Sequence, residues 1–471
     1  MPISTTNPAT GETLETFEAM DAEEVGKRLE RARAAFEEYR TTGFAERADL
    51  MRRAADKLEK DRDDIARTVT TEMGKPVTAA RAEVAKCVKA MRWYAERAEE
   101  LLADEYPSQG DVEDSGGTAA YVRYRPLGPV LAVMPWNFPL WQVIRFAAPA
   151  LMAGNTGLLK HASNVPRTAL YLEELFRHAG YPEGCFQTLL IGSGEVEGVL
   201  RDPRVAAATL TGSEPAGRSV ASVAGDEIKK TVLELGGSDP FLVLPSADLE
   251  KAAEVAVTAR TQNNGQSCIA AKRFIVHRDV YDEFARLFTD GMRALRVGDP
   301  MDESTEIGPL SSERGRADLE ELVEDARERG ATVLCGGRRP ASHPAGWFYE
   351  PTVLADVAPG MRIHREETFG PVATLYRVAD LDEAIEVAND TDFGLSSNVW
   401  TRDRAEQERC VRDLRAGGVY FNGMTASHPA MPFGGVKRSG YGRELSGHGI
   451  REFCNITTVW HGTPPDVPAA E

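Results

Sequence analysis

The chain has few cysteines and no long apolar stretch. Its six cysteines are scattered along 471 residues without a Cys-x-x-Cys pair. This argues against a disulfide framework and against a structural zinc site, and it favours the reducing cytoplasm as the compartment. No segment approaches the roughly 20 apolar residues that a membrane-spanning helix requires. Residues 1–8 have neither the basic nor the apolar region of a signal peptide.

Basic residues are also scarce relative to acidic ones. Lysine and arginine total 55 against 73 aspartates and glutamates, a net charge of −18. Binding to nucleic-acid phosphates and to anionic membranes depends on Lys and Arg, so we expect neither kind of partner. The eight histidines form no pattern such as His-Glu-x-x-His, so no metal is expected. The length and the 42% hydrophobic content are typical of a globular protein of about two to four domains.

The first 125 residues are predicted to form long helices followed by one strand. Helical spacing with charged outer faces covers Asp21–Arg40, Glu46–Val69 and Val77–Leu102. A polar break at Pro107–Gly117 leads to Ala119–Arg125, where residues alternate as in an extended strand. Together the break and the strand indicate an excursion from the first domain, a hairpin used for assembly.

From Gly128 on, short apolar strands alternate with helices. This pattern predicts βαβ units and a mostly parallel sheet with helices on both faces. The first set comprises strands at 130–134, 156–160, 186–191, 205–210 and 231–235 and helices at 143–153, 166–179, 196–201 and 213–223. The set after Pro240 comprises strands at 241–244, 274–277, 332–335 and 372–376 and helices at 250–260, 281–295, 319–329, 381–389 and 404–414. We therefore expect two α/β domains, with a disordered tail at 463–471.

Two glycine-containing turns are weak candidates for phosphate binding. Gly192-Ser-Gly194 with Gly198 has one residue too many between its last glycines for a dinucleotide fingerprint, and a plain turn is favoured. Thr211-Gly-Ser213 follows a predicted strand and opens a helix, whose backbone N–H groups could hold a phosphate. An ordinary N-cap serine is the favoured alternative there. No Gly-Lys-Ser/Thr sequence follows a glycine cluster, which excludes a P-loop.

Cys268 and Glu234 are the candidate reactive residues. A lone cysteine is most often an inert buried side chain, but Cys268 follows Gly265-Gln-Ser267, where a tight turn would expose the thiol. Glu234 lies in an apolar run, and taken alone it would be a charge at the edge of a strand. A carboxylate that acts as a base must lie within hydrogen-bond reach of the proton it removes. Sequence spacing does not show whether the two residues meet.

Five motifs together resemble those of the aldehyde dehydrogenase superfamily. In chain order they are Pro135-Trp-Asn-Phe-Pro139, Glu234-Leu-Gly-Gly237, Gly265-Gln-Ser-Cys268, Glu367-Thr-Phe-Gly-Pro371 and Pro432-Phe-Gly-Gly-Val-Lys-Arg-Ser-Gly440. The resemblance extends from near the N-terminus to about Trp460. Within the superfamily, the succinate-semialdehyde dehydrogenases look most similar, through 140–145, 159–164 and 268–273.

The resemblance implies a role for each catalytic candidate. As a thiolate, Cys268 would attack the aldehyde carbon. The Asn137 amide and the backbone N–H of Cys268 would hold the oxyanion. The resulting thiohemiacetal would pass a hydride to a nicotinamide. Glu234 would then activate water to hydrolyse the thioester, and Glu444 matches a carboxylate proposed as part of a proton relay.

The resemblance also implies a nicotinamide cofactor, with NADP favoured and NAD possible. The matching residues are Lys160 at the adenosine ribose, Trp136 and Ser213 at the pyrophosphate, and Glu367 and Phe369 at the nicotinamide ribose. Ser163 stands where NAD-preferring members often carry a glutamate that would repel a 2′-phosphate. A serine next to Lys160 removes that repulsion, so we expect NADP to be preferred.

For the substrate, the resemblance implies a carboxylate-binding pocket. Arg145 matches an arginine that binds the distal carboxylate in some succinate-semialdehyde dehydrogenases, and a guanidinium suits bidentate carboxylate recognition. The alternative for Arg145 is a surface charge on a helix, and Ser427 is a second candidate partner of the carboxylate. Gln262 stands where some of these enzymes carry an arginine, a difference that concerns substrate binding. Phe146 stands where many members of the superfamily carry a lysine, a difference that concerns the proton relay.

The expected architecture is therefore the aldehyde dehydrogenase fold, of α/β class. It would comprise a Rossmann-like cofactor domain (1–107 and 127–236), a catalytic domain (237–436), a small β oligomerisation segment (108–126 and 437–461) and a flexible tail (462–471). The expected function is NAD(P)-dependent oxidation of an aldehyde to a carboxylate, with succinate semialdehyde as the favoured substrate. Glutarate semialdehyde or an uncharged aldehyde is the alternative substrate, and a cofactor-independent thiol esterase is the alternative function. We expect a homodimer or homotetramer.

Overall fold

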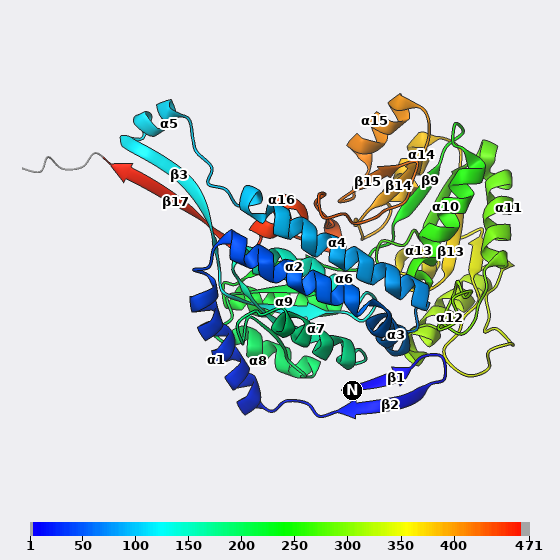
Figure 1. The fold of residues 1–471 in the computed structure, drawn as a ribbon. Helices are drawn as coiled ribbons and strands as arrows, with labels where there is room; N and C mark the ends of the chain where they lie inside the picture. Colours follow the sequence, from blue (N-terminus) through cyan, green and yellow to red (C-terminus); the bar gives the residue numbers. More distant parts are fainter. Residues whose placement is uncertain (1–2, 463–471) are drawn as a thin grey trace, which may run out of the picture.

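Two mostly parallel sheets organise residues 3–462, the part of the chain that the computed structural model describes. One sheet has the strand order β16-β8-β7-β4-β5-β6 and the other β11-β12-β13-β10-β9-β14-β15. Only the edge strands β11 and β16 pair antiparallel with their neighbours within these two sheets. In Figure 1 the second sheet lies at the upper right and the first is surrounded by helices at the lower left.

The first sheet confirms the strand-helix alternation expected for residues 128–235. Its strands are β4 (Pro129–Met134), β5 (Thr156–His161), β6 (Phe186–Thr188), β7 (Ala207–Thr211), β8 (Lys230–Glu234) and β16 (Gly440–Tyr441). The connecting helices are α6 (Trp141–Ala153), α7 (Pro166–His178), α8 (Val196–Arg201) and α9 (Glu214–Asp226), with a 3₁₀ turn η1 (Ser193–Glu195). Every residue of β5 and β7 is buried, as expected for strands covered on both faces.

The second sheet contains three short strands that the sequence pattern did not indicate. Its strands are β9 (Pro240–Val243), β10 (Arg273–His277), β11 (Thr332–Cys335), β12 (Thr352–Ala355), β13 (Val372–Val378), β14 (Ser397–Trp400) and β15 (Val419–Phe421). Its helices are α10 (Leu249–Thr261), α11 (Arg278–Ala294), α12 (Glu313–Glu328), α13 (Arg362–Arg365), α14 (Leu381–Asn389) and α15 (Arg404–Asp413). The strands β12, β14 and β15 were not predicted, although the equally short β9 and β11 were. Three or four residues show no periodic pattern, so such strands depend on a clear apolar run to be noticed.

The N-terminal region differs from the prediction at two places. After a hairpin of β1 (Ile3–Asn7) and β2 (Glu12–Phe17) come α1 (Ala22–Tyr39), α2 (Phe44–Lys60), α3 (Arg62–Met73) and α4 (Val77–Leu101). The single helix predicted over Glu46–Val69 is thus wrong: the chain leaves helical geometry at Asp61 (φ −85°, ψ 6°), whose carboxylate accepts a 3.0 Å hydrogen bond from the Tyr171 hydroxyl. The predicted polar break contains a short helix, α5 (Gln109–Asp114), capped by the Ser108 hydroxyl.

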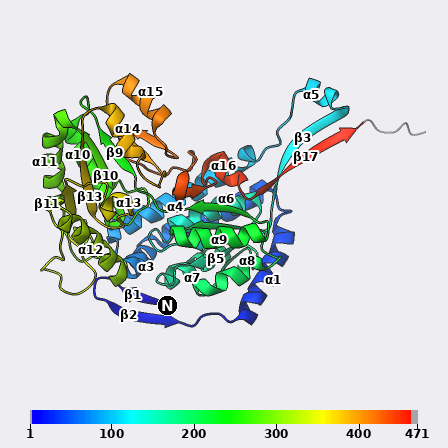
Figure 2. The same ribbon diagram turned by 180° about the vertical axis from the view of Figure 1, so that it is seen from behind.

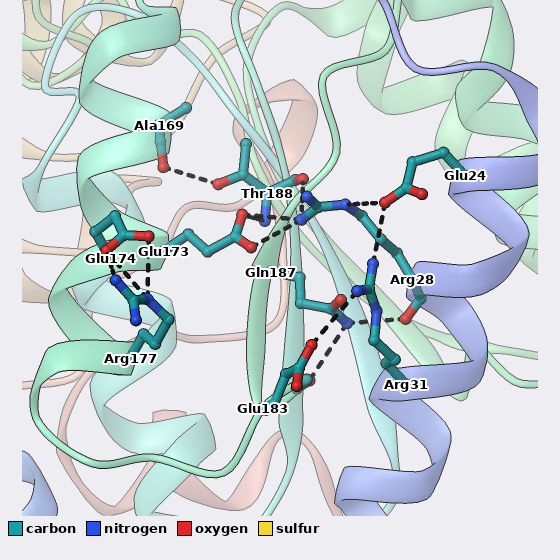
Figure 3. A network of polar contacts seen from close by, with 11 residues as sticks. Glu24, Arg28, Arg31, Ala169, Glu173, Glu174, Arg177, Glu183, Gln187 and Thr188 are labelled. Atoms are coloured by element: carbon teal, nitrogen blue, oxygen red, sulfur yellow. Dashed lines mark hydrogen bonds and ion pairs between the residues drawn. The ribbon is translucent and has the colours of Figure 1, made fainter.

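A polar network ties the first helix to the edge of the first sheet. Arg28 on α1 donates to both carboxylate oxygens of Glu173 on α7, at 2.8 and 2.9 Å. It also donates to the carbonyl of Thr188 on β6, whose own N–H donates to Glu173 (Figure 3). These contacts fix α1 against α7 and β6, and so anchor one side of the sheet.

A two-stranded ribbon projects from the body of the molecule. It consists of β3 (Gly117–Pro126) and β17 (Cys454–Gly462), which pair antiparallel, with α16 (Ser446–Arg451) at its base (Figures 1 and 2). The strand predicted at Ala119–Arg125 is confirmed within β3. None of the helices within residues 3–462 combines the length and apolar character needed to cross a bilayer. The tail predicted to be disordered, from 463 to 471, lies outside the described residues.

Candidate active site

One cavity gathers half of the twelve residues that the sequence analysis named as candidates. It is lined by Pro135, Trp136, Asn137, Thr211, Gly212, Ser213, Leu235, Gly236, Cys268, Glu367 and Phe369. Three of the contributing loops follow β4, β7 and β8, which are parallel neighbours whose carboxyl ends meet at one edge of the sheet. The remaining residues belong to loops that lead into β10 and β13 of the second sheet. The site therefore lies where the two sheets face each other.

The turn that carries Cys268 has an unusual backbone. After α10 ends, Asn263 (φ 58°), Asn264 (φ 58°) and Gly265 (φ 74°) are all left-handed. Asparagine and glycine adopt this conformation at the lowest cost. A Cβ at Gly265 would lie 2.3 Å from the carbonyl group of Gly370, so only glycine fits against this neighbouring loop. The motif thus encodes a tight turn packed on the Glu367–Pro371 loop, and it brings Cys268 to the cavity.

Lys272 fixes the backbone on both sides of the nucleophile. Its buried ammonium group donates to the carbonyl oxygens of Ser267 (2.9 Å) and Cys268 (2.7 Å) and forms an ion pair with Glu367 at 3.3 Å. Glu367 also accepts a 3.1 Å hydrogen bond from the N–H of Gly237. Lys272 and Glu367 together therefore join three of the five motifs. The sequence analysis did not identify this role of Lys272.

The Cys268 thiol is partly buried and neutral in this environment. Burial raises its pKa to about 12, and the positive charges of Arg145 and Lys272 oppose that shift. Because the thiolate and not the thiol is the nucleophile, reaction requires a group that removes the proton.

Asn137 is held against the nucleophile turn. Its side-chain amide donates to the carbonyl oxygen of Gln266 at 3.2 Å, and its backbone carbonyl accepts from the Asn263 amide at 2.7 Å. The amide and the thiol of Cys268 line the same cavity. This arrangement suits a donor to an oxyanion formed at a carbon bound to sulfur.

A buried ion pair anchors the loop that carries Asn137. Glu83 on α4 accepts hydrogen bonds from the backbone N–H groups of Leu140 (2.9 Å) and Trp141 (2.8 Å) at the start of α6. Its other oxygen contacts the Lys75 ammonium at 2.5 Å. A carboxylate at this place satisfies backbone donors that the first turn of a helix leaves free.

Glu234 and Glu444 form a buried pair of carboxyl groups with Arg145. Burial, and then the charge of Glu444, raise the pKa of Glu234, while Arg145 lowers it. Burial raises the pKa of Glu444, and Arg145 again opposes the shift. Neither oxygen of Glu234 has a hydrogen-bond partner among the described protein groups. A carboxyl group with a raised pKa and a free oxygen can take a proton near neutral pH.

Arg145 points inward, which excludes the alternative of a surface helix charge. Its side chain is only 2% exposed. The guanidinium forms an ion pair with Glu444, donates to the Thr211 hydroxyl at 3.3 Å and lies 4.7 Å from the centre of the Phe433 ring. The structure thus brings Arg145 together with the relay carboxylate Glu444.

Ser427, the second predicted substrate residue, lies next to a lysine that the sequence analysis missed. The Lys86 ammonium on α4 donates to the Ser427 hydroxyl at 2.7 Å and lies 4.4 Å from the centre of the Trp141 ring. Nothing in the local sequence marks Lys86, because α4 carries charged residues along its whole length.

The predicted cofactor residues fall into two groups. Trp136 and Phe369 face each other across the cavity edge to face, with ring centres 5.7 Å apart, beside Glu367. Ser213 is the N-cap residue of α9, the position that the N-cap alternative gave it, but its hydroxyl makes no capping hydrogen bond. The first N–H groups of α9 are therefore open to another acceptor such as a phosphate.

Lys160 and Ser163 lie at and after the end of β5, away from this first group. Lys160 is buried, and its ammonium has no ion pair or hydrogen bond within residues 3–462. Burial lowers the pKa of Lys160, and the charge of Glu195 opposes the shift. The backbone carbonyl of Ser163 accepts a 3.0 Å hydrogen bond from Ser4 in the N-terminal hairpin. The Gly192–Gly194 stretch forms part of a 3₁₀ turn, as the plain-turn interpretation requires.

A cavity that holds a cysteine thiol beside a side-chain amide fits a class of enzyme that forms a covalent intermediate on the cysteine. Residues 1–459 match the model of the aldehyde dehydrogenase family, and the chain belongs to this family. The family resemblance and the fold class inferred from the five motifs are thereby confirmed.

Similar proteins extend over the full length of the chain. The succinate-semialdehyde dehydrogenase (NADP+) 1 of Mycobacterium tuberculosis (strain ATCC 25618 / H37Rv) is 62% identical over 460 residues, covering 98% of this chain and 100% of the relative. The succinate-semialdehyde dehydrogenase (NADP+) of Mycobacterium avium (strain 104) is 61% identical over 464 residues, covering 98% and 97%. A crystal structure of succinic semialdehyde dehydrogenase from Streptococcus pyogenes with NADP+ superimposes with a TM-score of 0.94 at 37% identity, covering 98% and 100%.

Proposed function

We propose that this enzyme oxidises succinate semialdehyde to succinate with NADP+. The proposal is carried by the position of Cys268 and Asn137 in the lining of one cavity. The Glu234–Glu444 pair would supply the general base. The names of relatives at 61% and 62% identity support both the substrate and the cofactor.

The first step forms a bond between sulfur and carbon. Glu234 removes the proton of Cys268, and the thiolate adds to the aldehyde carbon. The electron pair of the carbonyl moves to its oxygen, where the Asn137 amide and the Cys268 N–H donate to it. Loss of one such donor costs about 10²- to 10³-fold in rate.

The residues present fit an NADP molecule. The Lys160 ammonium, which is unpaired within residues 3–462, would contact the adenosine ribose and its 2′-phosphate. Ser163 is uncharged and would not repel that phosphate. The open N-terminus of α9 at Ser213 suits the pyrophosphate, and Glu367 suits the nicotinamide ribose. Bound there, NADP+ would supply the acceptor for the hydride of the aldehyde carbon, and a thioester would remain on Cys268.

Hydrolysis then releases the product. Glu444, held by Arg145, first accepts from Glu234 the proton that came from Cys268 and releases it to the solvent, so that Glu234 can act as a base again. Glu234 then takes a proton from water, and the water oxygen attacks the thioester carbon. The carbon–sulfur bond breaks, the acid leaves, and the Cys268 thiolate takes that proton from Glu234 to restore the thiol.

The domain division and the assembly are part of the proposal. The cofactor residues from Trp136 to Ser213 fall in the predicted cofactor domain, and Cys268 and Glu367 fall in the predicted catalytic domain. The β3–β17 ribbon would serve as the assembly segment, since Ile456 (64% exposed) and Trp460 (50% exposed) present apolar surface on it. The mass of the enzyme in solution, measured by light scattering, tests the expectation of a homodimer or homotetramer.

The function is tested by following reduced-cofactor absorbance with purified enzyme. Succinate semialdehyde and uncharged butanal are compared, each with NADP+ and with NAD+. We expect a higher kcat/KM for succinate semialdehyde and for NADP+, and no turnover by Cys268→Ala. Equal turnover of butanal would contradict the assignment of succinate semialdehyde as the substrate. A preference for NAD+ would contradict the assignment of NADP+ as the cofactor. Ester cleavage that needs no nucleotide would favour a thiol esterase instead.

A further inference from the structure

Two buried cations hold the carbonyl groups of the turn that carries Cys268. The Lys272 ammonium donates to the carbonyl oxygens of Ser267 (2.9 Å) and Cys268 (2.7 Å). The Arg260 guanidinium donates to the carbonyl oxygen of Gly265 at 2.6 Å. Neither cation is more than 1% exposed. Charged donors in the protein interior therefore fix the backbone of this turn, in addition to the hydrogen bonds within it.

The bond to the Ser267 carbonyl also sets the direction of the Cys268 N–H. The Ser267–Cys268 peptide bond is trans, and in a trans peptide unit the C=O and N–H groups point in opposite directions. Because the carbonyl is held on Lys272, the Cys268 N–H points away from the ammonium. Within residues 3–462 this N–H donates to no protein acceptor, and Cys268 lines the active-site cavity. The N–H is therefore free to bind an oxygen on the carbon that the sulfur attacks.

We propose that Lys272 is a positioning residue for the oxyanion site, which acts through the Ser267 carbonyl on the Cys268 N–H. Lys272 holds the peptide unit in the direction that donation requires. A charged donor on the carbonyl also polarises the amide, which strengthens the N–H on its other side. This inference rests on the proposed attack of Cys268 on an aldehyde and names the group that prepares its backbone oxyanion donor. Lys272 acts from behind the turn, since its bonds go to two carbonyls and to Glu367.

Two other effects of Lys272 must be separated from this one. Burial raises the pKa of the Cys268 thiol, and the charges of Arg145 and Lys272 oppose that shift, so loss of Lys272 would also reduce the amount of thiolate. The ion pair of Lys272 with Glu367, at 3.3 Å, concerns the proposed cofactor site. The test must therefore work without nucleotide, and the amount of thiolate must cancel in it.

Two reactions of Cys268 in the full-length enzyme meet these conditions. Iodoacetamide alkylates the thiolate, and iodide leaves without formation of an oxyanion. Trifluoroacetone accepts the thiolate at its carbonyl carbon, and the electron pair moves to the oxygen; that carbon carries no hydride, so the reaction stops at the adduct. The dissociation constant of the adduct is measured from its protection of Cys268 against alkylation. Because both reactions use the same thiolate, the ratio of adduct affinity to alkylation rate reports on the oxyanion site.

In Lys272→Met this ratio should fall roughly 10- to 100-fold, which is less than the cost of about 10²- to 10³-fold for complete loss of an oxyanion donor. The loss is partial because the Ala270 N–H still donates to the Ser267 carbonyl at 3.1 Å. Lys272→Arg, which keeps a charged donor, should recover most of the ratio. Lys251→Met is the matched control, because Lys251 is exposed on α10, and it should leave the ratio unchanged.

Each outcome bears on a different statement. An unchanged ratio in Lys272→Met, with both reactions slowed alike, would mean that Lys272 affects only the amount of thiolate, and it would overturn the inference alone. If Lys272→Met does not fold, Lys272→Gln replaces it; this variant keeps an uncharged donor, so the ratio should fall by a smaller factor, and an unchanged ratio again overturns the inference. An unaltered enzyme that trifluoroacetone does not protect would overturn the proposed attack of Cys268 and the inference together.

Discussion

Replacing Arg145 with methionine should shift the pH dependence of turnover toward alkaline pH. The guanidinium pairs with Glu444 and lowers the pKa of both Glu444 and Glu234. Without it, both carboxyl groups would hold their protons to higher pH. Glu234 must be ionised to act as a base, so the rising limb of the kcat profile should move upward.

The size of the shift follows from the contact that is lost. A hydrogen bond to a charged group contributes about 1.5–3 kcal/mol, and about 1.4 kcal/mol corresponds to one pKa unit. The limb should therefore move by about one to two pH units. Below the pKa, the ionised fraction of Glu234 falls about tenfold per unit, so thioester hydrolysis at neutral pH should slow about 10- to 100-fold.

The assay separates hydride transfer from hydrolysis. A rapid-mixing experiment measures the first turnover of reduced cofactor and the steady rate that follows, across a series of pH values. In Arg145→Met both the first turnover and the steady rate should fall at neutral pH, for succinate semialdehyde and for butanal alike, because Glu234 acts as the base in both steps. Arg438→Met is the control, because Arg438 is exposed in the neighbouring motif.

Two results would contradict this reasoning. An unchanged rising limb would mean that Arg145 does not control Glu234 and Glu444. A rise of KM for succinate semialdehyde alone, with butanal turnover preserved, would support the role predicted from the family resemblance, in which Arg145 binds the distal carboxylate.

Three further predictions concern the scaffold and the cofactor. Glu83→Gln should lower the free energy of unfolding by about 3–5 kcal/mol, because it leaves the buried ammonium of Lys75 without its partner; denaturant unfolding measures this, and a change below about 1 kcal/mol would contradict it. Gly265→Ala should abolish turnover and lower the melting temperature, since its Cβ would meet Gly370 and its φ is positive. The exposed Gly110→Ala, with no atom within 4 Å of the added carbon, should do neither. Lys160→Met should lower kcat/KM for NADP+ more than for NAD+; an equal loss with both cofactors would refute a contact with the 2′-phosphate.

Elements with long periodic patterns could be predicted from the sequence, whereas several of the short ones could not. The helix expected over Asp21–Arg40 is α1, Ala22–Tyr39, because its apolar face repeats over many turns. The break between α2 and α3 escaped prediction, because the same periodicity continues through Asp61 and a tertiary contact with Tyr171 accompanies the change of direction.

A similar limit applies to the candidate functional residues. Cys268, Asn137 and Glu234 could be named from the sequence, because each lies within a short motif of neighbouring residues. Lys86 could not, because its partner Ser427 is 341 residues away and only the fold brings them together. Lys272 is close to Cys268 in sequence, yet its bonds to two backbone carbonyls leave no trace in a residue pattern.

The departure at Phe146 has a physical explanation in the structure. Many members of the superfamily carry a lysine there, but in this chain the Phe146 ring packs edge to face on Phe453, with ring centres 5.8 Å apart. Consecutive helical residues point about 100° apart, so α6 can direct only one of the positions 145 and 146 toward Glu444. Here that position is 145, and its guanidinium supplies the positive charge beside the relay carboxylate.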